Sequence, residues 1–468
     1  MVAFARPSPP PLSSKIFATL PFVLFSWYLI FRPLLGYLET PASRASAEPS
    51  ASSIGTTTAD WQNRAFLFAL LAITLLLALA NWSRLNFARL RSPPIMSLAA
   101  FLLFAGASVT WAYSREISFN RYCLELMVLT PIILPFAMGS PARDTVRSLY
   151  WCYALAILIN VIVVLNQKPM MTPEGTIFGY FGYFGFKQYL GQCASAAILL
   201  SFYEVLFSGW RRYLAILIAI ASVFLVFASE SKGSLVFMLV APCIAGVAIL
   251  ISGKLRVSAL LVLLAIPATY IAASMVSSTN LVNRISYMIY GDSTLTGRTV
   301  IWDFIHREIA QRPWFGWGFR SFWLVGNDAP SVTQAPYWVK HMTGSHSGYL
   351  DVKIETGVIG YWLFLIFIMA TLYAIERVRR RDPLRAWILL SLALYVTITN
   401  LIETLWLSTN DPMWFLFVLV AAETTRYSAV PKANPTTTRR HGPVRKSGPI
   451  RRGGLPQGVR TVAGRRPV

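Results

Sequence analysis

The sequence predicts an all-α, polytopic integral membrane protein of about twelve transmembrane helices with one large extracytoplasmic loop. Of its 468 residues, 55% are hydrophobic and only 13% are charged, and the mean hydropathy is +0.53. This composition is typical of a chain that crosses a bilayer many times, and it excludes a soluble globular protein of this size. A hydrocarbon core about 30 Å thick needs roughly 20 apolar residues per helix, because lipid offers no partner to an unpaired backbone group.

Apolar segments of about that length divide the chain into its parts. A bundle of about nine helices occupies residues 16–276, a polar loop follows over 277–352, and further transmembrane helices occupy 353–426. Residues 1–15 are rich in proline and 427–468 are basic with almost no apolar side chains, so we expect both ends to be disordered. The expected spans lie near 16–38, 64–82, 94–113, 119–138, 148–166, 188–207, 211–228, 232–252, 255–276, 350–375, 385–408 and 411–426.

Positive charge gathers on the short loops of one side of the predicted bundle. A net charge of +22 would suggest nucleic acid as the partner of a soluble protein. With both termini in the cytoplasm, however, every short inner loop is basic, as the positive-inside rule requires. The loop 277–352 then lies outside, because long segments cross largely regardless of charge. The inner cations are Arg84, Arg89, Arg91, Arg143, Arg147, Arg211, Arg212, Lys254, Arg256, Arg377, Arg379, Arg380, Arg381 and Arg385.

Two smaller features concern the chain's compartment. The segment Ala45-Ser46-Ala47 resembles a signal-peptide cleavage site, but the apolar region before it is too long and contains Arg32, so we expect an uncleaved first helix. Four cysteines lie within apolar spans without paired or metal-like spacing, and we interpret them as small hydrophobic residues. These are Cys123, Cys152, Cys193 and Cys243.

The outer loop carries an ordered set of landmarks. They are Thr296-Gly297-Arg298, Trp302, the segment Pro313 to Gly318, His346-Ser347-Gly348-Tyr349 and Glu355-Thr356-Gly357. In this order they resemble the large extracytoplasmic loop of the O-antigen ligase and Wzy-type polysaccharide polymerase superfamily, including its exopolysaccharide-polymerase branch. The resemblance covers Leu295 to Gly360 well, and weaker landmarks occur at Gly185 to Gly191 and at Ser229 to Ser234.

A lysine lies where two predicted spans meet with almost no loop between them. Lys232 belongs to Ser229-Glu230-Ser231-Lys232-Gly233-Ser234. The superfamily has Ser-Arg-Gly here, and the resemblance implies that its cation binds the pyrophosphate of a lipid carrier. Lysine keeps the charge but lacks the bidentate fork of arginine. The alternative is a Glu230–Lys232 pair that closes a tight turn.

The preceding outer loop is rich in glycine and aromatic residues up to Gly185, and Lys187 and Gln188 follow. Alternating aromatic residues suit an interfacial loop or a surface on which sugar rings stack. The superfamily has a glycine, a basic residue and an asparagine before this helix, so the resemblance assigns Lys187 a supporting role, although the asparagine is absent here. A plain aromatic belt is the alternative.

An amphipathic helix is predicted after Gly297, because Ile301, Trp302, Ile305 and Ile309 recur at helical spacing until a proline stops the pattern. Arg298 lies in its first turn, where unpaired N–H groups and a fixed charge favour a phosphate. A salt bridge that braces the loop is the alternative.

Further cations lie near the outer surface. Arg320 is a second candidate for phosphate or sugar contact within an aromatic segment, and a cation stacked on an aromatic face is its alternative. Arg115 and Arg121 follow the second outer turn. Either they reach the interface or pair with Glu116, or one of them lines an anionic lipid-phosphate site.

His346 is the predicted catalytic residue. It stands directly before a membrane helix, and a neutral imidazole accepts a proton near physiological pH. Ser345 or Ser347 can cap that helix, while Asp351 and Glu355 lie four residues apart on one of its faces and are the supporting acids. The superfamily has His-Asn here, and Ser347 replaces the asparagine. A histidine that only stabilises a helix end is the alternative.

The resemblance implies metal-independent, inverting glycosyl transfer from a polyprenyl-pyrophosphate-linked oligosaccharide to a glycan or lipid acceptor. The chain has no Asp-x-Asp and no Gly-rich nucleotide motif, so we expect neither metal nor cofactor. A polymerase of repeat units in exopolysaccharide or O-antigen synthesis is the main hypothesis, an O-antigen ligase the close alternative, and a transporter of lipid-linked sugars the third. We expect a bacterial inner membrane with the loop in the periplasm, and membrane lipids and polysaccharide assembly or export proteins as partners, but no nucleic acid.

Overall fold

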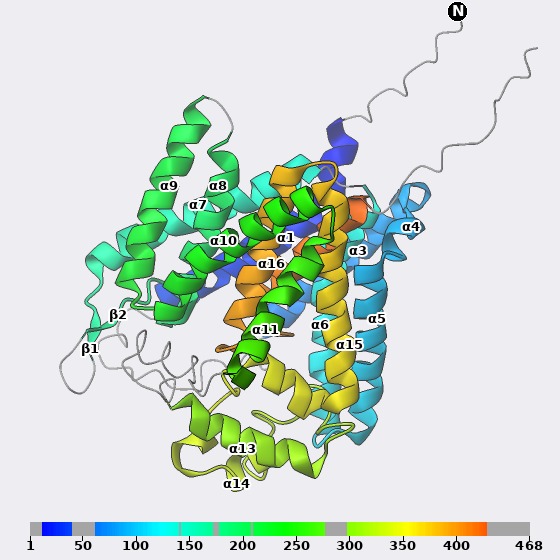
Figure 1. Ribbon diagram of the computed structural model, residues 1–468, viewed down its shortest axis with the longest axis vertical. Helices are drawn as coiled ribbons and strands as arrows, with labels where there is room; N and C mark the ends of the chain where they lie inside the picture. The colour runs from blue at the N-terminus through cyan, green and yellow to red at the C-terminus, as the bar shows by residue number, and fades with distance from the viewer. Residues whose placement is uncertain are drawn as a thin grey trace, which may run out of the picture. The chain divides into compact units, whose positions relative to one another are not determined.

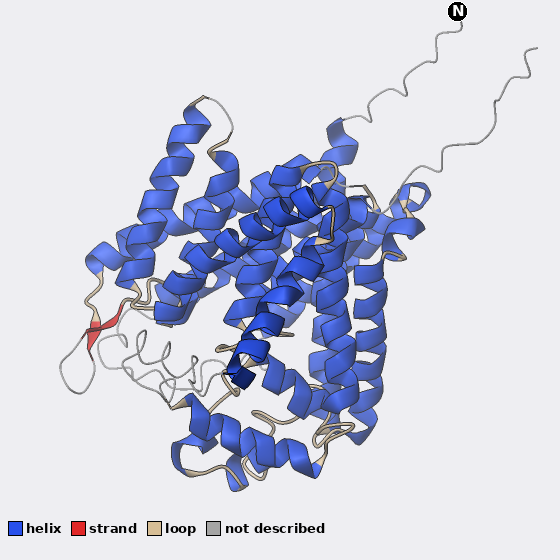
Figure 2. Cartoon of the chain, in the orientation of Figure 1, coloured by secondary structure: helices blue, strands red, loops and turns tan. Residues whose placement is uncertain are grey.

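The computed structural model describes residues 12–39, 61–139, 142–171, 177–206, 209–276 and 297–427. Within these ranges the chain is almost entirely helical, with one small β-hairpin (Figures 1 and 2). Disorder was predicted for residues 1–15 and 427–468. It is wrong for 12–15, where α1 begins, and for Tyr427, which ends a short 3-10 helix. Residues 1–11 and 428–468, and the first part of the predicted large loop, 277–296, lie outside the described residues.

Each of the predicted spans overlaps one helix of the described chain. Eight of these helices are long and apolar enough to cross a membrane. Helices α11 and α16 have shorter apolar stretches, α8 is more polar and α17 is short, so the number of spans stays a prediction. The helices are α1 (Leu12–Glu39), α3 (Trp61–Ala80), α5 (Pro93–Ser108), α6 (Arg115–Ala137), α7 (Ala142–Asn166), α8 (Lys187–Glu204), α9 (Trp210–Ala228), α10 (Lys232–Leu255), α11 (Ala259–Val276), α15 (Gly348–Arg379), α16 (Pro383–Thr399) and α17 (Pro412–Thr424).

Short elements connect the long helices. The strands β1 (Met170–Met171) and β2 (Ile177–Gly179) pair in an antiparallel hairpin. The other short elements are η2 (Trp82–Arg84), α4 (Phe87–Leu90), η3 (Val109–Trp111), α13 (Arg298–Gln311), α14 (Pro330–Thr333), η4 (Tyr337–His341) and η5 (Thr425–Tyr427).

The main core is apolar and is shared by the long helices. Its centre is aromatic: Trp414 of α17 is fully buried, and Trp406 packs with ring centroids 5.3 Å from Phe364 and 4.9 Å from Phe417. Aromatic pairs in edge-on contact add to the free energy of burial. This cluster fixes α15 against α17, and both helices carry residues of the candidate site or border it.

A separate, smaller core supports the layer that contains α13 and α14. We call this part the outer layer, after the side of the membrane predicted for its loop. Ile301, Ile305 and Ile309 of α13 are buried there, which confirms the predicted amphipathic helix. They pack against the aromatic segment that follows and against Ile354 of α15. In Figure 1, α13 and α14 lie together at one end of the helix bundle. The members of this core are Ile301, Phe304, Ile305, Ile309, Trp317, Phe322, Trp323, Val339 and Ile354.

Helix α15 is broken at Gly357, which has φ 66° and ψ −170°. The break leaves backbone groups without helical partners, and the segment 313–318 satisfies them. Trp317 N and Gly318 N donate to the carbonyls of residues 354 and 355, at 2.9 and 2.8 Å, and residue 358 N donates to Pro313 O at 2.8 Å. A side chain at Gly357 would clash with the carbonyl of Trp314. The aromatic motif is therefore the structural joint between the outer layer and α15.

The expected span 385–408 is too long, because α16 ends at Thr399. The chain then forms a loop over 400–411 before α17 begins. Asn400 closes the turn: its side-chain Oδ1 accepts from Leu405 N and Trp406 N, at 3.0 and 2.9 Å. This loop places Ile402, Glu403 and polar neighbours beside the outer end of α15.

Candidate active site

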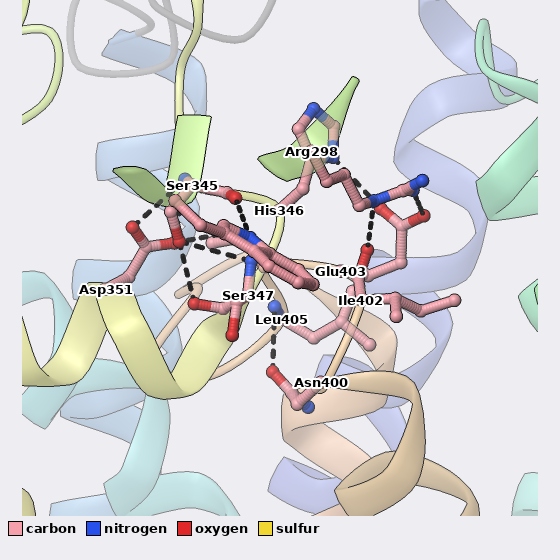
Figure 3. A network of polar contacts seen from close by, with 11 residues as sticks. Arg298, Ser345, His346, Ser347, Asp351, Asn400, Ile402, Glu403 and Leu405 are labelled. Carbon is pink, nitrogen blue, oxygen red and sulfur yellow. Dashed lines mark hydrogen bonds and ion pairs between the residues drawn. The ribbon is translucent and has the colours of Figure 1, made fainter. Parts of the chain in front are cut away.

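Arg298 is the first residue of α13. It follows the N-cap residue Gly297, which has a positive φ of 83°. Its guanidinium reaches the 400–411 loop. Nε donates to Ile402 O at 3.0 Å and Nη2 donates to Glu403 Oε1 at 2.8 Å (Figure 3). The side chain is 12% exposed, so this charge pair is largely shielded from solvent and is stronger than a surface pair.

His346 occupies a tight turn before α15, with a positive φ of 53°. Nδ1 lies 3.4 Å from Glu403 Oε2, and the side chain is 38% exposed. Within the described ranges, no protein group is hydrogen-bonded to Nε2. If Nδ1 carries the proton toward Glu403, Nε2 is the basic nitrogen and is open to a substrate. That is the tautomer a general base requires.

Two internal contacts fix the turn that carries His346. Ser345 Oγ donates to Ser347 O at 2.8 Å and also accepts from Ser347 N at 3.1 Å. Trp302 Nε1, from α13, donates to Ser345 O at 3.1 Å. Ser347 occupies the N-cap position of α15, but its side chain makes no capping bond; instead Gly348 N donates to the carbonyls of the 400–411 loop. The predicted serine cap is therefore wrong, and loop carbonyls replace it.

Glu403 joins the two predicted residues, and the sequence analysis missed it. Each of its carboxylate oxygens faces one partner, Arg298 or His346. The predicted span 385–408 places this acid inside a membrane helix, near its end. Two signals were present in the sequence: an uncompensated glutamate in an apolar stretch, and the polar run Ser408 to Asp411 before a proline.

Asp351 lies one turn into α15 and is buried. Its carboxylate accepts from three segments: Trp323 Nε1 at 2.9 Å, Ser345 N at 3.1 Å and Thr404 Oγ1 at 2.5 Å. A carboxylate that is satisfied in this way holds its neighbours in place. Asp351 therefore holds the turn of His346 and ties it to the 400–411 loop, and its supporting role in catalysis stays a prediction.

Arg320 and Glu355 lie close to each other. Arg320 Nη1 donates to Thr409 Oγ1 at 2.9 Å, and Thr409 in turn donates to the buried Glu125 of α6. Glu355 is buried within electrostatic reach of Arg320 and Arg121. No contact joins Arg320 to Arg298 or His346 among the described residues, so Arg320 belongs to a neighbouring polar cluster.

Arg121 has a different setting from those the sequence suggested. Its guanidinium donates to the carbonyls of Arg320, Trp323 and Leu324, at 2.5, 2.9 and 3.0 Å. It therefore holds the turn after the aromatic joint. Neither lipid phosphate nor a Glu116 pair is needed to explain its position near the bilayer.

Lys187 and Lys232 begin α8 and α10, which pack closely because Gly191 leaves room for Ser231 and Ser234. The two lysines lie within electrostatic reach of each other and of Glu230. Lys232 is exposed. Lys187 Nζ donates to Phe178 O at 2.9 Å and lies 3.6 Å from that ring's centroid. This pair of cations forms a second positive group.

The first turn of α8 carries both Lys187 and Tyr189. Tyr189 lies within electrostatic reach of Glu403. Within the described ranges no cluster of three histidine, cysteine, aspartate or glutamate side chains is arranged to hold a metal ion. The site thus consists of cations, one exposed imidazole and an acid between them, which suits the binding of an anionic group beside a base.

This combination defines a polytopic membrane protein with a cation–histidine site in its outer layer. Residues 197–365 match the family model of the O-antigen ligases, a range that includes Lys232, Arg298 and His346 but ends before Glu403. This match, over part of the chain, confirms the predicted resemblance to the O-antigen ligase and Wzy-type polymerase superfamily.

A curated relative is the exopolysaccharide production protein ExoQ of Rhizobium meliloti. The two sequences are 23% identical over 302 residues. The alignment covers 61% of this chain and 66% of the relative, slightly less than two thirds of its length. The name of this relative assigns it to exopolysaccharide production.

Proposed function

We propose that this protein is a glycosyltransferase that polymerises polyprenyl-pyrophosphate-linked oligosaccharide repeat units on the outer face of the bacterial inner membrane. The observation that carries the proposal is the contact of one carboxylate, Glu403, with both Arg298 and His346. This contact supports the proposal because it brings a guanidinium and an imidazole side by side, and Nε2 of the imidazole has no hydrogen-bond partner among the described residues. A sugar pyrophosphate already has a good leaving group, so phosphate binding and proton removal are the two tasks left to the protein.

In the proposed reaction, His346 Nε2 takes the proton of an acceptor hydroxyl as its oxygen attacks the anomeric carbon of the donor. The new C–O bond forms while the bond from that carbon to the pyrophosphate oxygen breaks, and the lipid pyrophosphate leaves with the electron pair. Arg298, beside Glu403, supplies the fixed positive charge that favours a phosphate oxygen. Lys187 and Lys232 supply further positive charge at the leaving group, and no step requires a metal.

Ligation of a finished glycan to a lipid acceptor is the second candidate, because the donor and the site are the same and only the acceptor differs. Surface glycans of a deletion strain separate the two. A polymerase mutant loses every chain longer than one repeat. Long polymer left on its lipid carrier would instead identify a ligase.

Transport of lipid-linked sugars is tested with purified protein in detergent, where no compartments exist. Chain growth there would show that transport is not the sole activity. The absence of any chain growth, with a folded protein and an intact lipid-linked donor and acceptor, would contradict the proposed polymerase.

A further inference from the structure

An apolar groove of about 450 Å³ lies open on the surface. It is lined by Trp111, Arg312, Pro313, Trp314, Phe315 and Gly316, none of which belongs to the candidate site around His346. Trp314 is 63% exposed and Phe315 is 52% exposed. Two such large aromatic side chains, adjacent and open, indicate a surface that meets an apolar partner. We call this feature the Trp314 groove.

The groove is formed where a predicted membrane span leaves the bilayer. Trp111 belongs to η3, directly after α5. Its Nε1 donates to Phe315 O at 3.0 Å, and the two rings lie 5.5 Å apart. The wall of the groove is therefore fixed to the outer end of a span, at the depth where lipid head groups meet hydrocarbon.

A cation borders the groove. Arg312 is exposed, and its guanidinium lies 4.2 Å from the centroid of the Trp317 ring. Across the described ranges no carboxylate pairs with it. An apolar groove beside a guanidinium that has no carboxylate partner is complementary to a lipid whose head group carries a phosphate. A free saccharide fits less well, because the lining offers almost no polar groups for its hydroxyls.

The groove and the candidate base lie at opposite ends of one rigid piece of helix. The carbonyls of Pro313 and Trp314 accept from the backbone of residues 358 and 359, just after the break in α15. His346 precedes the other end of that piece. The nine residues from Gly348 to Thr356 span about 13 Å at 1.5 Å per residue. A saccharide anchored in the groove can therefore extend its far end to His346.

We infer that the Trp314 groove binds the polyprenyl-pyrophosphate anchor of the acceptor oligosaccharide. The prenyl chain lies against Trp111, Trp314 and Phe315, and the pyrophosphate contacts Arg312. This inference rests on the proposed function, since a polymerase must hold two lipid-linked saccharides at once. The donor's pyrophosphate lies at Arg298 and the acceptor's at Arg312, and the acceptor's free end carries the hydroxyl that His346 deprotonates.

The test uses the full-length protein with the photoreactive residue p-benzoylphenylalanine in place of Phe315. The protein is placed in nanodiscs of phosphatidylcholine and phosphatidylglycerol that contain about one mole per cent undecaprenyl pyrophosphate. After irradiation, mass spectrometry identifies the attached lipid. We expect undecaprenyl pyrophosphate to be enriched at least tenfold over its share of the bilayer, and R312A to remove most of that enrichment. R307A, which removes another exposed arginine of the outer layer, is the matched control.

Attachment of lipids in proportion to the bilayer's composition would overturn the inference, because Trp314 and Phe315 would then only anchor the protein in the interface. Enrichment that R312A leaves intact would overturn the role of Arg312. Chain growth by the wild-type protein separates these failures from failure of the proposed function. If the inference holds, R312A also raises the KM for the lipid-linked acceptor about tenfold and leaves the KM for the donor unchanged. Tyr337→Ala, at an exposed aromatic residue outside the groove, should change neither KM.

Discussion

Glu403 Oε2 lies 3.4 Å from Nδ1 of His346, although 57 positions separate the two residues in the chain. The same carboxylate binds Arg298 through its other oxygen. A carboxylate at this place accepts the Nδ1–H of the imidazole and so fixes which ring nitrogen faces the substrate. The pair therefore couples the proposed base to the proposed phosphate ligand.

We expect Glu403→Gln to lower turnover roughly 10²-fold, because the amide keeps the size of the side chain but loses the charge that orients the imidazole. The measurement is the initial rate of chain growth by the purified protein, with the melting temperature of the same preparation. Asp303→Asn removes an exposed acid from α13 and is the control. A loss of turnover that is matched by a lower melting temperature would mean that Glu403 only supports the fold.

Lys232→Ala and Arg298→Ala should each raise the KM for the donor by about tenfold to a hundredfold, because a charge-assisted hydrogen bond contributes about 1.5–3 kcal/mol. Lys232→Arg should retain activity, since it restores the fork that binds phosphate. Lys340→Ala, at an exposed lysine of η4, controls for loss of charge alone. Normal donor binding and normal polymer in both alanine variants would refute the assignment.

Glu308→Gln should raise the apparent melting temperature by about 1–2 °C near neutral pH. Glu308 is buried in the outer core, where burial raises its pKa above the ordinary value of 4.5, and its Oε2 has no partner among the described groups. An acid whose pKa is raised by folding costs stability once the pH exceeds its unfolded value. The gain should therefore disappear in acid below about pH 4.5, where both states are protonated. Thermal scans at several pH values check this, with Asp303→Asn as control.

The fold was predictable because its main determinants are local. Apolar runs give the membrane helices, and the isoleucines after Gly297 at helical spacing give α13. The break of α15 was not predictable, since it depends on backbone bonds between residues 313–318 and 354–359 that no local pattern encodes. The aromatic segment 313–318 therefore acts as a joint that its own sequence does not reveal.

The candidate site was predictable only in part. Arg298 and His346 stand at helix starts, which sequence patterns reveal, and the structure brings them together through Glu403. Glu403 was missed because hydropathy continued the predicted span past the real end of α16 at Thr399. Arg320 was placed by its aromatic neighbours, whereas its actual partner is Thr409 of the same unrecognised loop.

His346→Gln should nearly abolish turnover, with a loss of about 10²–10⁴-fold, while the affinity for the donor stays unchanged. Glutamine approximates the reach of the imidazole and keeps its hydrogen-bonding capacity, but it cannot take a proton from the acceptor hydroxyl. A base at this position needs a ring nitrogen with a free lone pair, which the imidazole offers and the amide nitrogen of glutamine does not.

Initial rates of chain growth, together with donor binding to the same preparations, measure both effects. His341→Gln is the matched control, since His341 lies in η4 and makes no contact with Glu403 within the described ranges. A His346→Gln protein that keeps more than about a tenth of wild-type turnover would make His346 a helix-end histidine without a role as base. The base would then have to be sought at Glu355, because Asp351 already accepts hydrogen bonds from Trp323, Ser345 and Thr404.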